Sequence, residues 1–181
     1  MRLETSKPDG THGIHLEVSD FQEIFGEGLS SYVQSKIRDY DFWFQPLNSS
    51  ERDQCILDVT DALLHRNLVR AGVERHDQWE KGWGENLALF ENSKQIDAIV
   101  PKYFEKLNIV RWKQEWIKPV SKHFEYRMLA IIQDWLFDQY LRDKDEIYEF
   151  GCGTGHNLFR ARQVNPRAKI WGLDWASSSQ G

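Results

Sequence analysis

Three glycines at alternate positions, with one acid just before them and another nineteen positions after them, are the residues of this chain best suited to chemistry. The glycines are Gly151, Gly153 and Gly155, and the acids are Glu149 and Asp174. Glycine has no Cβ and adopts positive φ readily, so a ligand can lie directly against the backbone of such a turn. Amides of the turn, and of a helix that starts after it, favour a polar or anionic group there. The pattern predicts a site for a nucleotide-derived ligand.

The residues around this turn predict the elements that must position it. Segment 147–150 is strand-forming, a helical pattern follows Gly155, and a second short apolar run spans residues 169–173. Ligands of open α/β sheets bind at the carboxyl ends of the strands, where both Glu149 and Asp174 fall. A carboxylate at the end of the second strand is placed to accept hydrogen bonds from both hydroxyls of a ribose.

Two nucleotide-derived cofactors use turns of this kind. The dinucleotide fingerprint G-x-G-x-x-G needs its third glycine where helix and strand pack closely. In this chain His156 holds that position, and the third glycine comes one residue earlier. An acid two residues before the first glycine, as at Glu149, is not part of that fingerprint either. A dinucleotide site would therefore need an atypical turn.

The arrangement E-x-G-x-G-x-G resembles motif I of the class I S-adenosylmethionine-dependent methyltransferases, and Asp174 resembles the acid that ends their second strand. The resemblance covers residues 147–176. It implies S-adenosyl-L-methionine as the cofactor, with Glu149 near the methionyl ammonium group and Asp174 on the ribose. The cofactor-binding residues that it implies are Glu149, Gly151, Gly153, Gly155 and Asp174.

The resemblance implies direct displacement at the sulfonium methyl, in which the protein mainly supplies alignment. A hydroxyl acceptor would also need a base, and no residue is singled out for that role, so the catalytic residues stay unassigned. We expect a small-molecule or glycan acceptor, such as a sugar or another small metabolite. Two alternatives remain open, which are an NAD(P)-binding oxidoreductase with an atypical glycine turn and a non-catalytic, truncated methyltransferase that acts as an interaction module.

The fold class that follows is α/β. We expect a flexible arm over residues 1–13 and a mainly helical region over 14–142, with a short strand or hairpin, as a candidate cap or acceptor-specificity region. Residues 143–181 then start a Rossmann-like domain with its first β–α–β unit. A doubly wound sheet needs further βα units, and parallel sheets need both faces covered. We therefore expect the chain to be the N-terminal part of a larger enzyme, as a truncated sequence or a gene remnant.

Local patterns predict several elements of the N-terminal region. Alternation in Tyr40–Phe44 predicts a strand that ends at Pro46. Asn48 and Glu51 have the spacing of a capping box for a helix that stops near Gly72. The apolar face predicted for this helix consists of Ile56, Val59 and Leu63.

A second helix, over Ser121–Leu141, is the clearest of the chain, because Phe124, Met128, Ile131 and Trp135 recur at helical spacing. By contrast, the two glycines in Glu80–Asn86 predict a shaped loop. Trp79 and Trp83 would share a face if that segment were helical, and we favour ordinary core packing for them over an aromatic wall for a ligand ring.

Other residues with reactive side chains are weaker candidates. His12 and His15 lie in the expected arm without a cluster of acids, so we expect no metal site. Cys152 fits the turn as a small residue rather than as a catalytic thiol. We favour structural or surface positions over catalytic ones for the remaining histidines, with His156 on a helix surface: His65, His76, His123 and His156.

Composition narrows the classes of partner. A net charge of −5 disfavours general binding to nucleic acid or to anionic membranes. Two cysteines do not build a disulfide framework, and no long apolar run is visible, so we expect a cytoplasmic protein that does not enter the membrane. Between Pro101 and Arg127 there are seven Lys or Arg residues and three Glu. This segment would attract a phosphate-bearing acceptor or form a solvated face of mixed charge, and we favour the second. The oligomeric state is not indicated.

Overall fold

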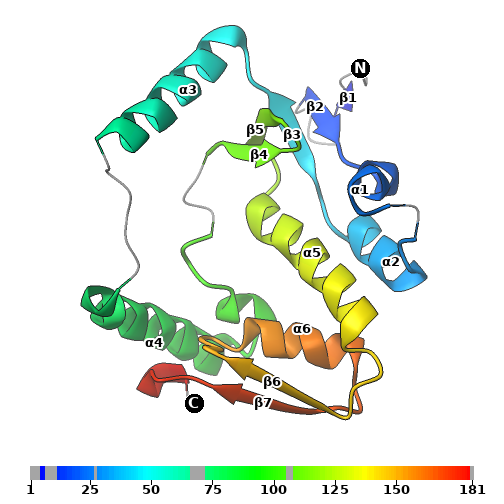
Figure 1. Ribbon diagram of the computed structural model, residues 1–181, viewed down its shortest axis with the longest axis vertical. Helices are drawn as coiled ribbons and strands as arrows, with labels where there is room; N and C mark the ends of the chain where they lie inside the picture. The colour runs from blue at the N-terminus through cyan, green and yellow to red at the C-terminus, as the bar shows by residue number, and fades with distance from the viewer. Residues whose placement is uncertain (1–4, 7–11, 27, 66–71, 105–107, 180–181) are drawn as a thin grey trace.

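An antiparallel sheet and a separate pair of parallel strands organise the chain (Figure 1). The computed structural model describes residues 5–6, 12–26, 28–65, 72–104 and 108–179. The elements are, in order, β1 Thr5–Ser6, β2 His12–His15, α1 Val18–Phe25, α2 Ser31–Asp39, β3 Trp43–Pro46, α3 Ser49–Leu64, the 3₁₀ turn η1 Val73–Arg75, α4 His76–Ser93, η2 Ile96–Ile99, β4 Val110–Trp112, β5 Glu115–Pro119, α5 Phe124–Tyr140, β6 Glu146–Phe150, α6 His156–Val164, β7 Lys169–Leu173 and η3 Ser177–Ser179.

The N-terminal region is built on the antiparallel sheet, whose strand order is β1-β2-β3-β5-β4. Helices α1, α2 and α5 share its core with the sheet. At the centre Phe42 contacts Phe21 and Phe124, with ring centroids 5.2 and 5.5 Å apart. Buried aliphatic and aromatic residues complete this core: Leu16, Leu29, Val33, Ile37, Phe44, Trp112, Ile117 and Ile131.

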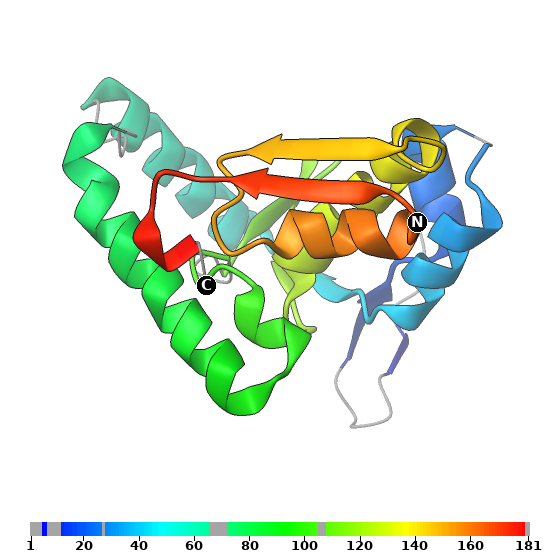
Figure 2. The ribbon, with the colours of Figure 1, turned by 90° about the horizontal axis from the view of Figure 1, so that it is seen from below.

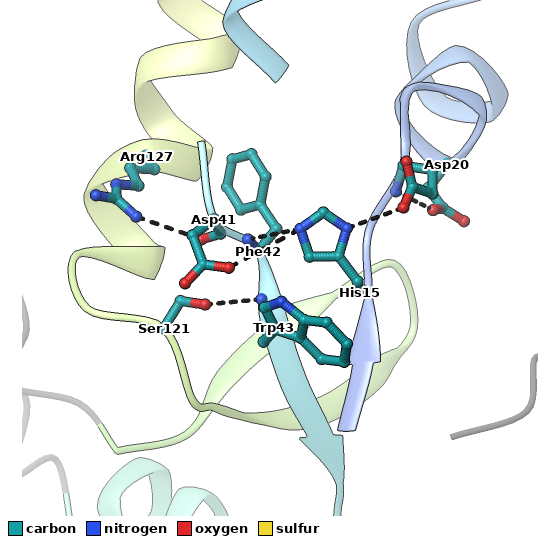
Figure 3. Close-up of polar contacts among 8 residues, drawn as sticks. His15, Asp20, Asp41, Phe42, Trp43, Ser121 and Arg127 are labelled. Carbon is teal, nitrogen blue, oxygen red and sulfur yellow. Dashed lines mark hydrogen bonds and ion pairs between the residues drawn. The ribbon is translucent and has the colours of Figure 1, made fainter. Parts of the chain in front are cut away.

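Polar side chains fasten strand β3 to its neighbours (Figure 3). His15 Nε2 accepts the Phe42 N–H at 3.3 Å, and its Nδ1 lies 3.0 Å from a Glu17 carboxylate oxygen. Ser121 Oγ accepts the Trp43 N–H at 2.8 Å. These bonds satisfy backbone donors just where the regular ladder of β3 starts.

Helix α5 confirms the helix predicted over Ser121–Leu141, within three residues at its start and one at its end. It connects the N-terminal core to α6 through a buried ion pair between Asp134 and Arg160. Asp134 has no exposed surface and Arg160 is 5% exposed. Arg160 also donates to the Ala130 carbonyl at 2.9 Å. Charges this deeply buried persist only when they are paired.

The strand–turn–helix–strand unit predicted around the glycines is present. Strands β6 and β7 pair in parallel, with Glu149 opposite Gly172, and α6 lies along one face of the pair (Figure 2). A Cβ at Gly172 would meet Leu158 Cδ1 at 2.5 Å and Cys152 Sγ at 2.8 Å, so a side chain there would require these two side chains to shift. A small core of Ile147, Ala161 and Ala168 holds the layers together.

The other face of the strand pair carries apolar side chains that remain exposed. Tyr148, Phe150, Trp171 and Leu173 are between 48 and 81% exposed. We call these four residues the open face. Parallel sheets normally bury both faces.

Two sequence predictions for the N-terminal region need correction. His12 and Gly13 are not part of a flexible arm, because they pair in β2, and Thr5–Ser6 pair with them as β1; residues 1–4 and 7–11 lie outside the described part. The expected single strand or hairpin is a sheet of five short strands. Its β4–β5 hairpin turns at Lys113 and Gln114, a pair without the Asn-Gly or Asp-Gly signal of tight hairpins.

Two helices also differ from expectation. Helix α3 has the predicted capping box at Asn48 and Glu51, but it ends at Leu64 rather than near Gly72. Its predicted apolar face, with Ile56, Val59 and Leu63, is 43 to 61% exposed. The predicted loop at Glu80–Asn86 is wrong, because this segment lies inside α4. Among the described residues, no helix is both long and apolar enough to cross a membrane.

Candidate functional site

The glycine turn has the backbone geometry expected of it. Gly151, Gly153 and Gly155 adopt φ of +77°, +52° and +76°, a region that side chains disfavour. The Gly151 and Cys152 amides donate to the Leu173 carbonyl at 2.7 and 3.3 Å. The turn is therefore bonded to the end of β7 as well as to its own strand.

Both predicted acids lie at this turn. Asp174 accepts the Gly153 N–H through Oδ2 at 2.7 Å and the Ala176 N–H through Oδ1 at 2.9 Å. Glu149 accepts the Asn157 amide at 2.7 Å through Oε1. The structure thus brings all five predicted residues to the carboxyl ends of β6 and β7, with Asn157 as a partner that the sequence pattern did not single out.

One carboxylate oxygen of Glu149 lacks a hydrogen-bond partner within the described part of the chain. Its Oε2 atom is buried and accepts no hydrogen bond from any described residue. Burial raises the pKa of this carboxyl above its usual range and nearby Asp174 adds to the rise, while the Asn157 bond opposes it. A buried carboxylate oxygen without a donor is costly, and a cation or strong donor beside it would be stabilised.

Aromatic side chains from α4, with Trp175 from the segment after β7, gather beside the turn. Trp83 packs on Gly153, where a Cβ would come within 3.2 Å of the indole. Trp79 stacks on Trp83 with ring centroids 6.2 Å apart and an angle of 17°, and Trp175 lies 5.7 Å from Trp83. His76 stacks on Trp175 at 4.2 Å. We call Trp79, Trp83, Trp175 and His76 the aromatic group.

Glu80 fixes η3 to the same helix. Its carboxylate oxygens accept the Ser177 and Ser178 amides at 3.1 and 2.9 Å, so it satisfies donors at the start of η3. Ser178 Oγ donates to the Glu80 carbonyl at 3.2 Å. The segment after β7 is therefore held on α4, as Figure 2 shows. This role of Glu80 could not be predicted from the sequence, because its partners in η3 lie almost a hundred positions away.

His156 is not on a helix surface, as the sequence favoured, but is buried at 8% exposure. Its Nδ1 lies 3.2 Å from Thr154 Oγ1, and its ring is 6.2 Å from that of Tyr126. Burial, and secondarily Arg160, lowers the pKa of His156 to about 4. A neutral imidazole of such low basicity is a poor general base near neutral pH.

Two cavities touch the glycine turn and its acids. One, of about 210 Å³, lies between the turn and α4 and is lined by Trp83, Phe90 and Gly153. The other, of about 360 Å³, is lined by Glu149 and Asn157. Asn86 shapes the first cavity, because its buried amide donates to the Ala98 and Val100 carbonyls at 2.6 and 2.9 Å and holds η2 in place.

The environments of the other candidate catalytic residues favour structural roles. Burial raises the pKa of the Cys152 thiol, so a reactive thiolate is disfavoured there. Ser121, His15 and Asp41 are the residue types of a nucleophilic triad, but Ser121 Oγ and His15 Nε2 each accept a backbone N–H of β3 (Figure 3). No cluster of three metal-ligating side chains occurs among the described residues.

Several lysines in the described part of segment 101–127 are paired with acids of other elements. The ion pairs join Lys102 to Glu85, Lys113 to Glu23 and Lys118 to Glu51. Arg127 differs, because it lines a cavity. No protein-family model, curated protein or solved structure matches this chain.

Proposed function

We propose that this chain carries the cofactor-binding unit of a class I S-adenosylmethionine-dependent methyltransferase. The observation that carries the proposal is the buried Glu149 Oε2 atom, which has no partner among the described residues. It stands beside a turn whose three glycines adopt positive φ. A cationic ammonium group of a ligand would complete the bonding of this carboxylate. A dinucleotide offers no such cation at that place in its fingerprint.

The residues present fit the cofactor in part. Glu149 would hold the ammonium group, the bare backbone of the turn would allow close approach, and Asp174 would accept from the ribose. Each Asp174 oxygen already accepts one amide, but an ionised carboxylate has about four acceptor sites, so two remain. Trp83 covers Gly153, so binding requires this indole to move or to stack on the ligand.

The chemistry of the reaction comes from the sulfonium group of the cofactor, whose methyl is already activated. The chain supplies orientation through the glycine turn and the two acids, and the aromatic group excludes water above the turn. A small-molecule or glycan acceptor is proposed, with no catalytic base assigned. The exposed open face further supports the proposal of a Rossmann-like domain, because the crossover helices of such a domain cover both faces of its parallel sheet.

Glycine amide resonances of the turn provide the test. The 181-residue protein is titrated with S-adenosylhomocysteine, and with NADH in parallel, while the Gly151, Gly153 and Gly155 amides are followed by NMR. We expect S-adenosylhomocysteine alone to shift them. Binding should be weak, with a dissociation constant of about 1 mM, because the strands that carry the turn are incompletely packed at the open face. Glu149→Gln should abolish saturation, while Glu146→Gln, an exposed acid on the same strand, should not.

Each other outcome selects an alternative. Shifts with NADH only would favour the oxidoreductase with an atypical turn. A folded protein whose glycine amides respond to neither compound would favour an interaction module. Equal loss in both Glu variants would show that Glu149 has no specific role at the ligand.

A further inference from the structure

A cavity of about 260 Å³ lies between α2, η2, α5 and α6, away from the two predicted acids. Three cationic side chains from three helices line it, which are Lys36, Arg127 and Arg160. Among its described lining residues, Asp97 is the one carboxylate. We call this cavity the basic chamber.

The cations differ in how far their charge is already offset. Arg160 pairs with buried Asp134, although its Nε atom is buried without a hydrogen-bond partner among the described residues. Arg127 donates to the Asp41 carbonyl at 3.4 Å (Figure 3). Its guanidinium group also stands over the Tyr40 ring, 5.6 Å from the ring centroid. Lys36 stands over the Tyr32 ring at 5.5 Å. Lys36 also interacts electrostatically with Asp134, the partner of Arg160. Within the described part of the chain, Arg127 is therefore the cation of the chamber whose charge is least offset, and Lys36 shares one carboxylate with Arg160.

Two further residues of the chamber stay neutral at physiological pH. Burial raises the pKa of the Tyr126 hydroxyl, so it remains protonated and can donate. Burial lowers the pKa of His156 to about 4, so its ring adds no charge. Asp97, at the end of the chamber formed by η2, is exposed, and water screens its charge. The field inside the chamber is thus positive at neutral pH.

The basic chamber adjoins the cavity beside the glycine turn. Ile96, Ile99 and Phe159 line both, so these three side chains form a shared wall. The cavity beside the turn is lined mainly by apolar side chains, including Trp83 and Phe90 of α4. It is called the aromatic chamber below. A charged chamber and an apolar one therefore meet at these three side chains, and the apolar one extends to Gly153.

We propose that the two chambers bind one small amphipathic molecule, with a phosphate monoester in the basic chamber and an apolar ring in the aromatic chamber. Guanidinium groups and phosphate oxygens form the strongest charge-assisted hydrogen bonds. A phosphate monoester carries close to two negative charges at pH 7 and three acceptor oxygens, which match several cations better than a carboxylate does. That this molecule is the methyl acceptor rests on the proposed function, whereas its binding does not.

The test uses phenyl phosphate, benzoate and phenol as probes of the 181-residue protein, without any cofactor analogue. Binding is followed by NMR through the Arg side chains and the indole N–H groups. We expect phenyl phosphate to bind at least about fivefold more tightly than benzoate or phenol, with a gap that narrows as salt is added. Equal affinity for phenol and phenyl phosphate, or no binding of phenyl phosphate, would overturn the proposal.

Substitutions of the lining residues test which chamber binds the phosphate and which binds the ring. Arg127→Gln and Lys36→Gln should each weaken phenyl phosphate binding about five- to tenfold, while Lys113→Gln, a lysine paired with Glu23 on the surface, should not. Trp83→Ala should weaken phenyl phosphate binding but not inorganic phosphate binding. An equal loss in the Lys113 variant would reduce the effect to net charge and contradict the site. If phenyl phosphate binds as expected while S-adenosylhomocysteine leaves the glycine amides unshifted, the proposed function fails and the anion site stands.

Discussion

The indole of Trp83 lies on the backbone of Gly153, so that a Cβ at Gly153 would be 3.2 Å from its Cε2 atom. The two residues are seventy positions apart and come from α4 and the glycine turn. Absence of a side chain at Gly153 therefore serves the packing of this structure as well as any ligand.

Substitution by alanine should change stability in opposite directions at Gly153, which contacts Trp83, and at Gly82, which has open space around it. Gly153→Ala should lower the free energy of unfolding by about 1–2 kcal/mol, because alanine disfavours φ of +52° and Trp83 would have to shift. Gly82→Ala, inside α4 with open space around it, should raise that free energy by about 0.5–1 kcal/mol. Urea unfolding monitored by circular dichroism measures both. A Gly153→Ala protein as stable as the parent would contradict the contact.

The buried ion pair predicts a large loss of stability on removal of one partner. Asp134→Asn should lower the free energy of unfolding by about 3–5 kcal/mol, because it leaves the Arg160 guanidinium buried without a counter-charge. Asp61→Asn, which affects an exposed pair with His65, serves as the control and should leave stability unchanged. A combined Asp134→Leu, Arg160→Met variant should be more stable than Asp134→Asn, since no charge is then left unpaired; the reverse order would refute this account.

Burial of His156 predicts a pH dependence of stability. The pKa of His156 is lowered to about 4 in the folded state, whereas the unfolded chain has the ordinary value near 6.5. Above pH 6.5 neither state is protonated, so stability is fully present. As pH falls from 6.5 to 4, the unfolded state gains a proton that the folded state does not, and about 3 kcal/mol is lost.

The measurement is urea unfolding of the parent and of His156→Gln between pH 4 and 8. The difference between the two proteins should be constant above pH 7 and should change progressively below it. Comparison of the two proteins removes the contribution of Glu149, whose raised pKa acts in the opposite direction. Parallel curves across the whole range would show that His156 is protonated equally in both states.

The hydrogen bonds of Asn86 to the η2 segment predict a loss of stability when its side chain is removed. Asn86→Ala should lower the free energy of unfolding by about 2–3 kcal/mol, because the Ala98 and Val100 carbonyls lose their donor at a buried position. Asn92→Ala, at an exposed position of the same helix, is the matched control and should have little effect. Hydrogen exchange of the η2 amides should rise in the first variant only. Unchanged exchange would mean that other contacts hold η2.

The sequence by itself determined the local structure around the glycines and the position of helix α5. The glycine spacing, the strand-forming residues before it and the acid at Asp174 predicted β6, α6 and β7, because these signals act within a few residues of one another. Helix α5 was visible for the same reason, through apolar residues at helical spacing. The capping box at Asn48 predicted where α3 begins, but nothing nearby marked its end at Leu64.

Tertiary structure alone decided what surrounds the site. Gly82 and Gly84 disfavour a helix locally, yet packing of Trp83 on the turn and of Glu80 on η3 holds α4 helical. His156 becomes buried, and Lys36, Arg127 and Arg160 line one cavity, only because α2, α5 and α6 pack together. Contacts between residues thirty or more positions apart leave no periodic trace in the sequence, so they emerge only when the chain has folded.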